Sequence, residues 1–93
     1  MPHFEIAHLN EQGQDMVIIP LEDSFDHRSD REQQSTVDEL QLRSSAAGLK
    51  GIVVPVWNSG DRMRFIAPIK WHAFFQDMSM PSVQARLNKT LSW

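Results

Sequence analysis

Two runs of β-branched residues, each carrying a proline, constrain the fold of this chain more than any other feature. They are Met16-Val17-Ile18-Ile19-Pro20 and Ile52-Val53-Val54-Pro55-Val56-Trp57. β-Branched and aromatic side chains favour strands, whereas proline lacks the N–H that a central strand needs and is found at strand ends, bulges or edges. The pattern predicts two strands, and Pro55 predicts that the second of them is an edge strand or is bulged.

Each of these runs has a partner strand across a turn. Phe4 and Ile6 alternate with polar residues ahead of the turn-rich residues 10–14, and residues 63–67 follow a turn at 58–61. Alternation on both sides of a short polar break is typical of a β-hairpin. The sequence therefore predicts two hairpins.

Residues 30–47 are predicted to form a helix. Ser29 and Glu32 have the spacing of a capping box, in which the hydroxyl accepts from a first-turn N–H and the carboxylate reaches back to the cap. Gly48 suits the position just past the last turn because glycine adopts positive φ readily. These local signals define both ends of the helix.

The C-terminal region is less clearly patterned. Residues 69–75 are expected to form a short helical turn, and residues 81–91 form a further element. Val83, Leu87 and Leu91 recur every four residues, which favours a helix, although strict alternation through the same stretch keeps a strand open. The combined prediction is an α+β fold of order ββαββα, with two hairpins in a mostly antiparallel four-stranded sheet and the helices on one face.

Length and composition indicate one domain spanning residues 1–93, with an acidic exposed loop at about 22–30. The chain has no cysteine, which excludes disulfides and thiolate chemistry. Its first residues lack the basic and apolar regions of an export signal, and no segment approaches the ~20 apolar residues that span a bilayer. We expect a cytoplasmic protein without a membrane partner.

Charge is divided between the two halves of the chain. Residues 1–47 carry three Arg against ten Asp and Glu, whereas residues 48–93 carry six Lys and Arg against two Asp. The overall net charge of −3 thus combines about −7 with about +4. The opposite charges are expected either to face each other within the fold or to favour association.

The basic half contains interleaved cationic and aromatic residues, which are the components of a single-stranded nucleic-acid site. They also suit a protein or peptide surface, and no RNP-type motif, helix-turn-helix pattern or phosphate loop accompanies them. The candidate nucleic-acid or partner-binding residues are Arg62, Arg64, Lys70, Trp71, His72, Phe74, Arg86 and Lys89, and Phe75 lies beside them.

The sequence offers little for catalysis or metal binding. The densest group of polar ligands is Asp23, Asp26, His27 and Asp30, and its spacing matches no known metal motif. His72 has no partner in the sequence that indicates a general base, and no serine lies in a GxSxG elbow. We predict that the chain is not an enzyme and uses neither a metal nor a cofactor.

Three classes of function remain. The leading hypothesis is a small non-enzymatic protein-interaction module, homodimeric or bound to another protein, which uses an open sheet edge or an exposed helix face. Leu42, which points away from Leu40 on the helix, and Val54, in the expected edge strand, are the candidate dimer-face residues. An RNA- or single-stranded-DNA-binding domain is the alternative, and a small enzyme is the third class.

Overall fold

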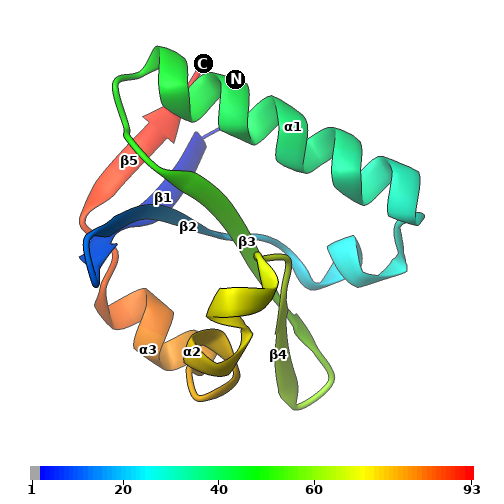
Figure 1. Ribbon diagram of the computed structural model, residues 1–93. Coiled ribbons are helices and arrows are strands. Elements are labelled where there is room, and N and C mark those ends of the chain that lie inside the picture. Colours follow the sequence, from blue (N-terminus) through cyan, green and yellow to red (C-terminus); the bar gives the residue numbers. More distant parts are fainter. Residues whose placement is uncertain (1–2) are drawn as a thin grey trace.

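The computed structural model describes residues 3–93 as five strands and three α-helices, with two short 3-10 segments (Figure 1). In chain order they are β1 (His3–Glu11), β2 (Gln14–Pro20), η1 (Asp23–His27), α1 (Asp30–Ala46), β3 (Ile52–Ser59), β4 (Arg62–Phe65), η2 (Ile69–Trp71), α2 (His72–Gln76), α3 (Met80–Ala85) and β5 (Lys89–Ser92). The strands form one mixed sheet in the order β4-β3-β2-β1-β5. The α+β class and both predicted hairpins are confirmed.

The first hairpin closes through a two-residue turn. Glu11 pairs with Gln14, and the residues between them, Gln12 and Gly13, have φ values of 52° and 79°. Two successive positive φ values match the right-handed twist of the flanking strands, which is why such turns connect hairpins. This turn projects from the sheet and is important for the cavity described below.

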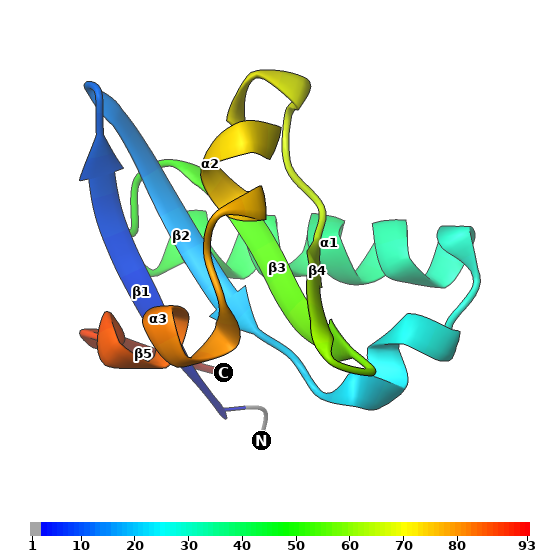
Figure 2. The ribbon, with the colours of Figure 1, turned by 90° about the horizontal axis from the view of Figure 1, so that it is seen from below.

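The four-stranded sheet with helices on one face was a wrong prediction. β2 and β3 run parallel, so η1 and α1 form the crossover between them, and Figure 2 shows α1 on one side of the sheet with α2 and α3 on the other. The unbroken burial of Met16–Ile19 and of residues 53–57 explains the arrangement. A strand that is apolar on both faces needs cover on both faces.

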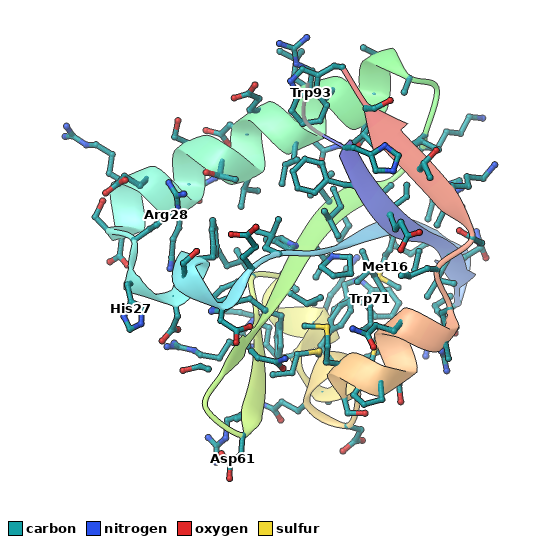
Figure 3. The ribbon with its side chains drawn as sticks, turned by 180° about the vertical axis from the view of Figure 1, so that it is seen from behind. Met16, His27, Arg28, Asp61, Trp71 and Trp93 are labelled. Atoms are coloured by element: carbon teal, nitrogen blue, oxygen red, sulfur yellow. The ribbon has the colours of Figure 1, made fainter. Side chains whose placement is uncertain are left out.

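Each face has its own core. On the α1 side lie Ile6, Val17, Ile19, Leu40, Val53 and Leu91. On the α2 and α3 side lie Ala7, Met16, Ile18, Val54, Val56, Trp71, Phe75, Met80 and Val83. Figure 3 shows Met16 and Trp71 in the interior, whereas His27 and Asp61 lie at the periphery.

α1 begins and ends close to where the sequence predicts. The Ser29 hydroxyl accepts from the Glu32 backbone N–H at 3.2 Å, and Gly48 follows the last turn with φ 81°. The helix buries a narrow stripe, of which Leu40 and Ser44 are the fully enclosed members. Leu42 is 67% exposed on the opposite side.

The prediction of an edge position for β3 was wrong for the strand as a whole, because β4 lies outside it. β4 pairs only with Val56–Ser59, however, so the first half of β3 has a strand on one side alone. There the Gln41 side chain takes the place of a strand: its amide donates to the Gly51 carbonyl at 3.0 Å and accepts from the Val53 N–H at 2.9 Å. Pro55 lies at the end of the β3–β4 pairing, where its carbonyl accepts from the Ile66 N–H at 3.2 Å and a residue without an N–H is tolerated.

The C-terminal residues form both of the elements between which the sequence left a choice. α3 ends at Ala85, and the chain then adds β5 antiparallel to the first part of β1. The Asn88 side chain leads into this pairing by accepting from the His8 N–H at 2.9 Å and donating to the His8 carbonyl at 3.0 Å. A helix through 81–91 was therefore wrong beyond α3, because the open edge of β1 offers a ladder that a longer helix would leave unpaired.

Among residues 3–93, no helix is both long enough and apolar enough to cross a membrane.

Candidate functional site

β4 lies at one edge of the sheet, and its outer side is the candidate site. Arg62 and Ser59 flank the two-residue turn of the β3–β4 hairpin, and the Ile66 N–H donates to the Pro55 carbonyl at 3.2 Å. Backbone groups alternate in direction along a strand, so those of residues 62, 64 and 66 point to β3. The N–H and C=O groups of Met63 and Phe65 consequently point away from the sheet, and no hydrogen bond to them occurs among residues 3–93.

A groove runs along this edge between β4 and α2. It has a volume of about 480 Å³ and is lined by Arg62, Met63, Arg64, Phe65, His72 and Gln76. The Phe65 ring packs edge-on against the His72 imidazole, with 5.4 Å between ring centroids. An edge strand beside a helix is the arrangement in which extended peptides add to a sheet.

Arg64 and Arg62 differ in their electrostatic environment. The Arg64 guanidinium lies 3.2 Å from a carboxylate oxygen of Asp26, which belongs to η1. Among the described residues, Arg62 takes part in no ion pair. The groove therefore carries one charge that is already matched and one that is available to a ligand.

The Asp26 side chain connects η1 to the β3–β4 hairpin through hydrogen bonds. Its carboxylate accepts from the Trp57 indole N–H at 3.1 Å and from the Ser59 hydroxyl at 2.9 Å, in addition to Arg64. These hydrogen bonds, followed in importance by the Arg64 charge, lower the pKa of Asp26 below its ordinary value of 3.8. The acidic cluster predicted in the sequence thus has a member with a structural role.

The remaining predicted residues do not form one surface. Trp71 is 6% exposed and Phe75 is 1% exposed, so both belong to the core, whereas Phe74 is half-buried and Lys70 is exposed. Trp71 and Phe75 therefore do not lie in the groove beside Arg62 and Arg64. The helical turn of η2 and α2 sends most of the large rings inward.

The distant members lie elsewhere. Arg86 pairs with Glu11 at 3.9 Å, and Lys89 is exposed on β5 at the other edge of the sheet. Val54 is fully enclosed in the core and contributes nothing to an exposed dimer face, whereas Leu42 is exposed. Two of the ion pairs, Arg64 with Asp26 and Arg86 with Glu11, join the basic half of the chain to the acidic half.

Two histidines, His72 and His8, make hydrogen bonds to backbone carbonyls. The His72 Nε2 lies 2.9 Å from the Ala67 carbonyl oxygen, and the His8 Nε2 lies 2.9 Å from the Lys50 carbonyl oxygen. Within the described part of the chain, neither ring has a carboxylate hydrogen-bonded to its other nitrogen. Over residues 3–93, His, Asp and Glu side chains form no group of three or more that could hold a metal ion.

No protein-family model, curated protein or solved structure matches this chain. The assignment of a site therefore depends on geometry.

Sequence reasoning missed three features of this geometry. The outward backbone of Met63 and Phe65 is set by hairpin register, which the turn at 60–61 could have supplied. Ile69 is 86% exposed, which its apolar side chain gives no reason to expect. Gln76, the far wall of the groove, has no signal in the sequence because only the path of α2 places it there.

Proposed function

We propose that this protein is a non-enzymatic interaction module that binds an extended segment of a partner protein along the outer edge of β4. The observation that carries the proposal is the pair of unpartnered outward-facing residues, Met63 and Phe65, at the floor of a groove beside α2. Together they supply two donors and two acceptors at strand spacing, which is the recognition unit of an added strand.

Charge indicates the composition of the bound segment. Side chains of an added strand alternate between the two faces of the sheet, so every second residue of the partner would lie on the face that carries Arg62 and Arg64. Acidic residues at those positions match the available Arg62 guanidinium. The intervening residues would lie over Phe65, His72 and Gln76, where apolar or amide side chains fit.

The burial of the aromatic rings favours a protein ligand over a nucleic acid. Stacking requires an exposed ring face, and Trp71 and Phe75 are in the core. Backbone pairing at an edge strand needs no such face. The same edge could receive β4 of a second copy, which makes homodimerisation an outcome to be measured alongside peptide binding.

The test is a selection of phage-displayed random octapeptides on the intact protein, followed by fluorescence anisotropy with a selected peptide. We expect acidic residues at alternate positions. Met63→Pro removes one outward N–H without breaking a bond to β3, and loss of one such bond corresponds to roughly tenfold weaker binding. Leu42→Ser is the matched control on α1 and should leave peptide binding unchanged.

Two outcomes would contradict the proposal. One is peptide binding that Met63→Pro leaves intact and Leu42→Ser abolishes, which would move the interaction to α1. The other is a selection that enriches no peptide above an uncoated surface. Sedimentation equilibrium of the wild type and Met63→Pro distinguishes self-pairing, because a dimer formed through β4 should dissociate in the variant.

A further inference from the structure

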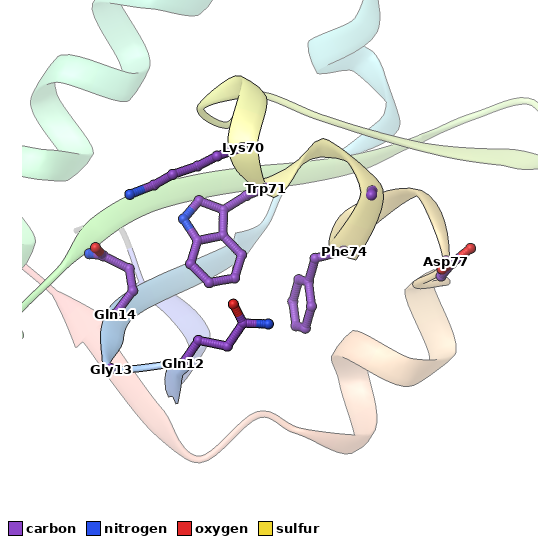
Figure 4. Close-up of a pocket in the computed structure, with 8 residues that line it drawn as sticks. Gln12, Gly13, Gln14, Lys70, Trp71, Phe74 and Asp77 are labelled. Carbon is purple, nitrogen blue, oxygen red and sulfur yellow. The ribbon is translucent and has the colours of Figure 1, made fainter.

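A second cavity lies on the other side of α2 from the β4 groove, where η2 and α2 approach the turn between β1 and β2. It has a volume of about 540 Å³ and is lined by Gln12, Gly13, Gln14, Lys70, Trp71, Ala73, Phe74 and Asp77 (Figure 4). Two amide side chains, an ammonium and a carboxylate line it together with the half-buried ring of Phe74. The cavity is therefore polar at its rim and aromatic at its floor.

The informative group is the Trp71 indole N–H. Trp71 is 6% exposed, and its Nε1 is buried without a hydrogen-bond partner among the described residues. A buried donor without an acceptor is destabilising, and most buried polar groups in proteins are paired. Trp57, in contrast, donates its indole N–H to Asp26 at 3.1 Å.

The unpartnered N–H faces the cavity side on which Lys70 and Gln14 lie. Figure 4 shows the indole nitrogen on the edge of the ring nearest these two side chains, with the Phe74 ring beyond the opposite edge. Lys70 is exposed and takes part in no ion pair among residues 3–93, so its ammonium is available to an anion bound near the indole nitrogen. An acceptor placed there would meet a neutral donor and a positive charge together.

We infer that this cavity binds a small organic carboxylate, whose oxygens accept from the Trp71 N–H and pair with Lys70 while its apolar body lies on Phe74. A carboxylate satisfies both donors, because it accepts several hydrogen bonds and carries the charge that complements an ammonium. A neutral carbonyl satisfies the indole alone. A cation is repelled by Lys70 and finds its only opposite charge at Asp77, on the far side of the Phe74 ring.

Indole NMR tests this inference directly. The chain has three tryptophans, so the ¹H–¹⁵N spectrum contains three indole signals. The signal that is absent from the spectrum of Trp71→Phe belongs to Trp71. The probes are phenylacetate, phenylacetamide and phenethylamine, which share a benzyl body and differ in charge. We expect phenylacetate to move the Trp71 signal downfield along a saturable curve, and phenylacetamide to bind roughly tenfold more weakly.

Lys70→Gln is the second variant and lies on the surface, so it leaves the fold intact. It should weaken phenylacetate binding to the level of phenylacetamide and leave phenylacetamide unchanged. The indole signals of Trp57 and Trp93 are internal controls that should stay in place. Trp71→Phe keeps an aromatic side chain, smaller than indole, and removes the donor, so the backbone amide signals of this variant should show no preference for the carboxylate.

The inference is overturned if the Trp71 signal does not move with phenylacetate up to about 10 mM, ten times the dissociation constant of a weak millimolar ligand. It is also overturned if all three indole signals move together, which indicates a non-specific effect. Equal binding of the three probes would show that the cavity recognises the ring and not the carboxylate. None of these results bears on peptide binding at β4.

Discussion

Replacement of Gln41 by alanine should destabilise the protein through the uncovered half of β3. The Gln41 amide makes two hydrogen bonds to backbone, at 3.0 Å to the Gly51 carbonyl and at 2.9 Å to the Val53 N–H. Each contributes about 1 kcal/mol net, and the better helix propensity of alanine returns only a few tenths. We expect a loss of about 2 kcal/mol in the free energy of unfolding.

Urea unfolding monitored by tryptophan fluorescence measures this loss, and for a domain of this size it corresponds to a fall in Tm of roughly 10 °C. The matched control is Gln34→Ala, which lies on the same helix and removes only an exposed bond from Gln34 to Asp38. That variant should stay within about 0.5 kcal/mol of the wild type.

A second substitution separates the two bonds. Gln41→Glu keeps an acceptor for the Val53 N–H but loses the donor to the Gly51 carbonyl and places a negative charge beside that oxygen. It should be at least as destabilising as alanine. If Gln41→Ala and Gln34→Ala unfold at the same urea concentration, the amide does not substitute for a strand and the explanation given for the open half of β3 is refuted.

Three further substitutions have definite expected outcomes. Asp26→Asn should lower the free energy of unfolding at neutral pH. Because folding lowers the pKa of Asp26 below 3.8, its stabilisation is present above pH 3.8 and is lost as the pH falls through the pKa of the folded state. The urea unfolding curves of the wild type and the variant should therefore converge in acid. Leu40→Ala should cost about 2–5 kcal/mol, whereas Leu42→Ala should change unfolding by less than about 0.5 kcal/mol; equal effects in thermal melts would contradict the packing of α1. Gly51→Ala should cost about 2–4 kcal/mol, because Gly51 has φ 112° and an added Cβ would overlap the Asp15 carbonyl; a wild-type Tm would disprove that close approach.

The elements themselves could be predicted because their signals are local. Ser29 with Glu32 marked the start of α1, Gly48 marked its end, and β-branched runs marked β2 and β3. Each of these signals depends on φ and ψ preferences or capping within a few residues. Such preferences act in the same way whatever the rest of the chain does.

The position of β3 in the sheet was harder to predict, because its proline and its continuous apolar run indicate different positions. Pro55 indicated an edge strand, yet the run from Val53 to Trp57 is buried on both faces, which is typical of an interior strand in a parallel pair. Both observations hold at once because β4 is too short to cover all of β3. The length of a neighbouring strand is not encoded in the residues of β3.

In the candidate sites, too, the sequence indicated the residue types and the tertiary structure set their arrangement. The sequence identified Arg62, Arg64, Lys70, Trp71 and Phe74 as a basic and aromatic set, and those residue types are present by composition alone. Tertiary structure separated them into a groove at β4 and a cavity beside η2, since α2 passes between the two. It also enclosed the Trp71 ring while leaving Ile69, two residues earlier, 86% exposed.

The sequence by itself determined the two hairpins, where α1 begins and ends, and that opposite charges are concentrated in opposite halves of the chain. Only the tertiary structure decided that β2 and β3 are parallel, that helices cover both faces, that the last residues close the sheet as β5, and which donors are left without partners. These features arise from contacts between residues far apart in the chain. Their free energy depends on how the segments pack together and leaves no pattern within any one of them.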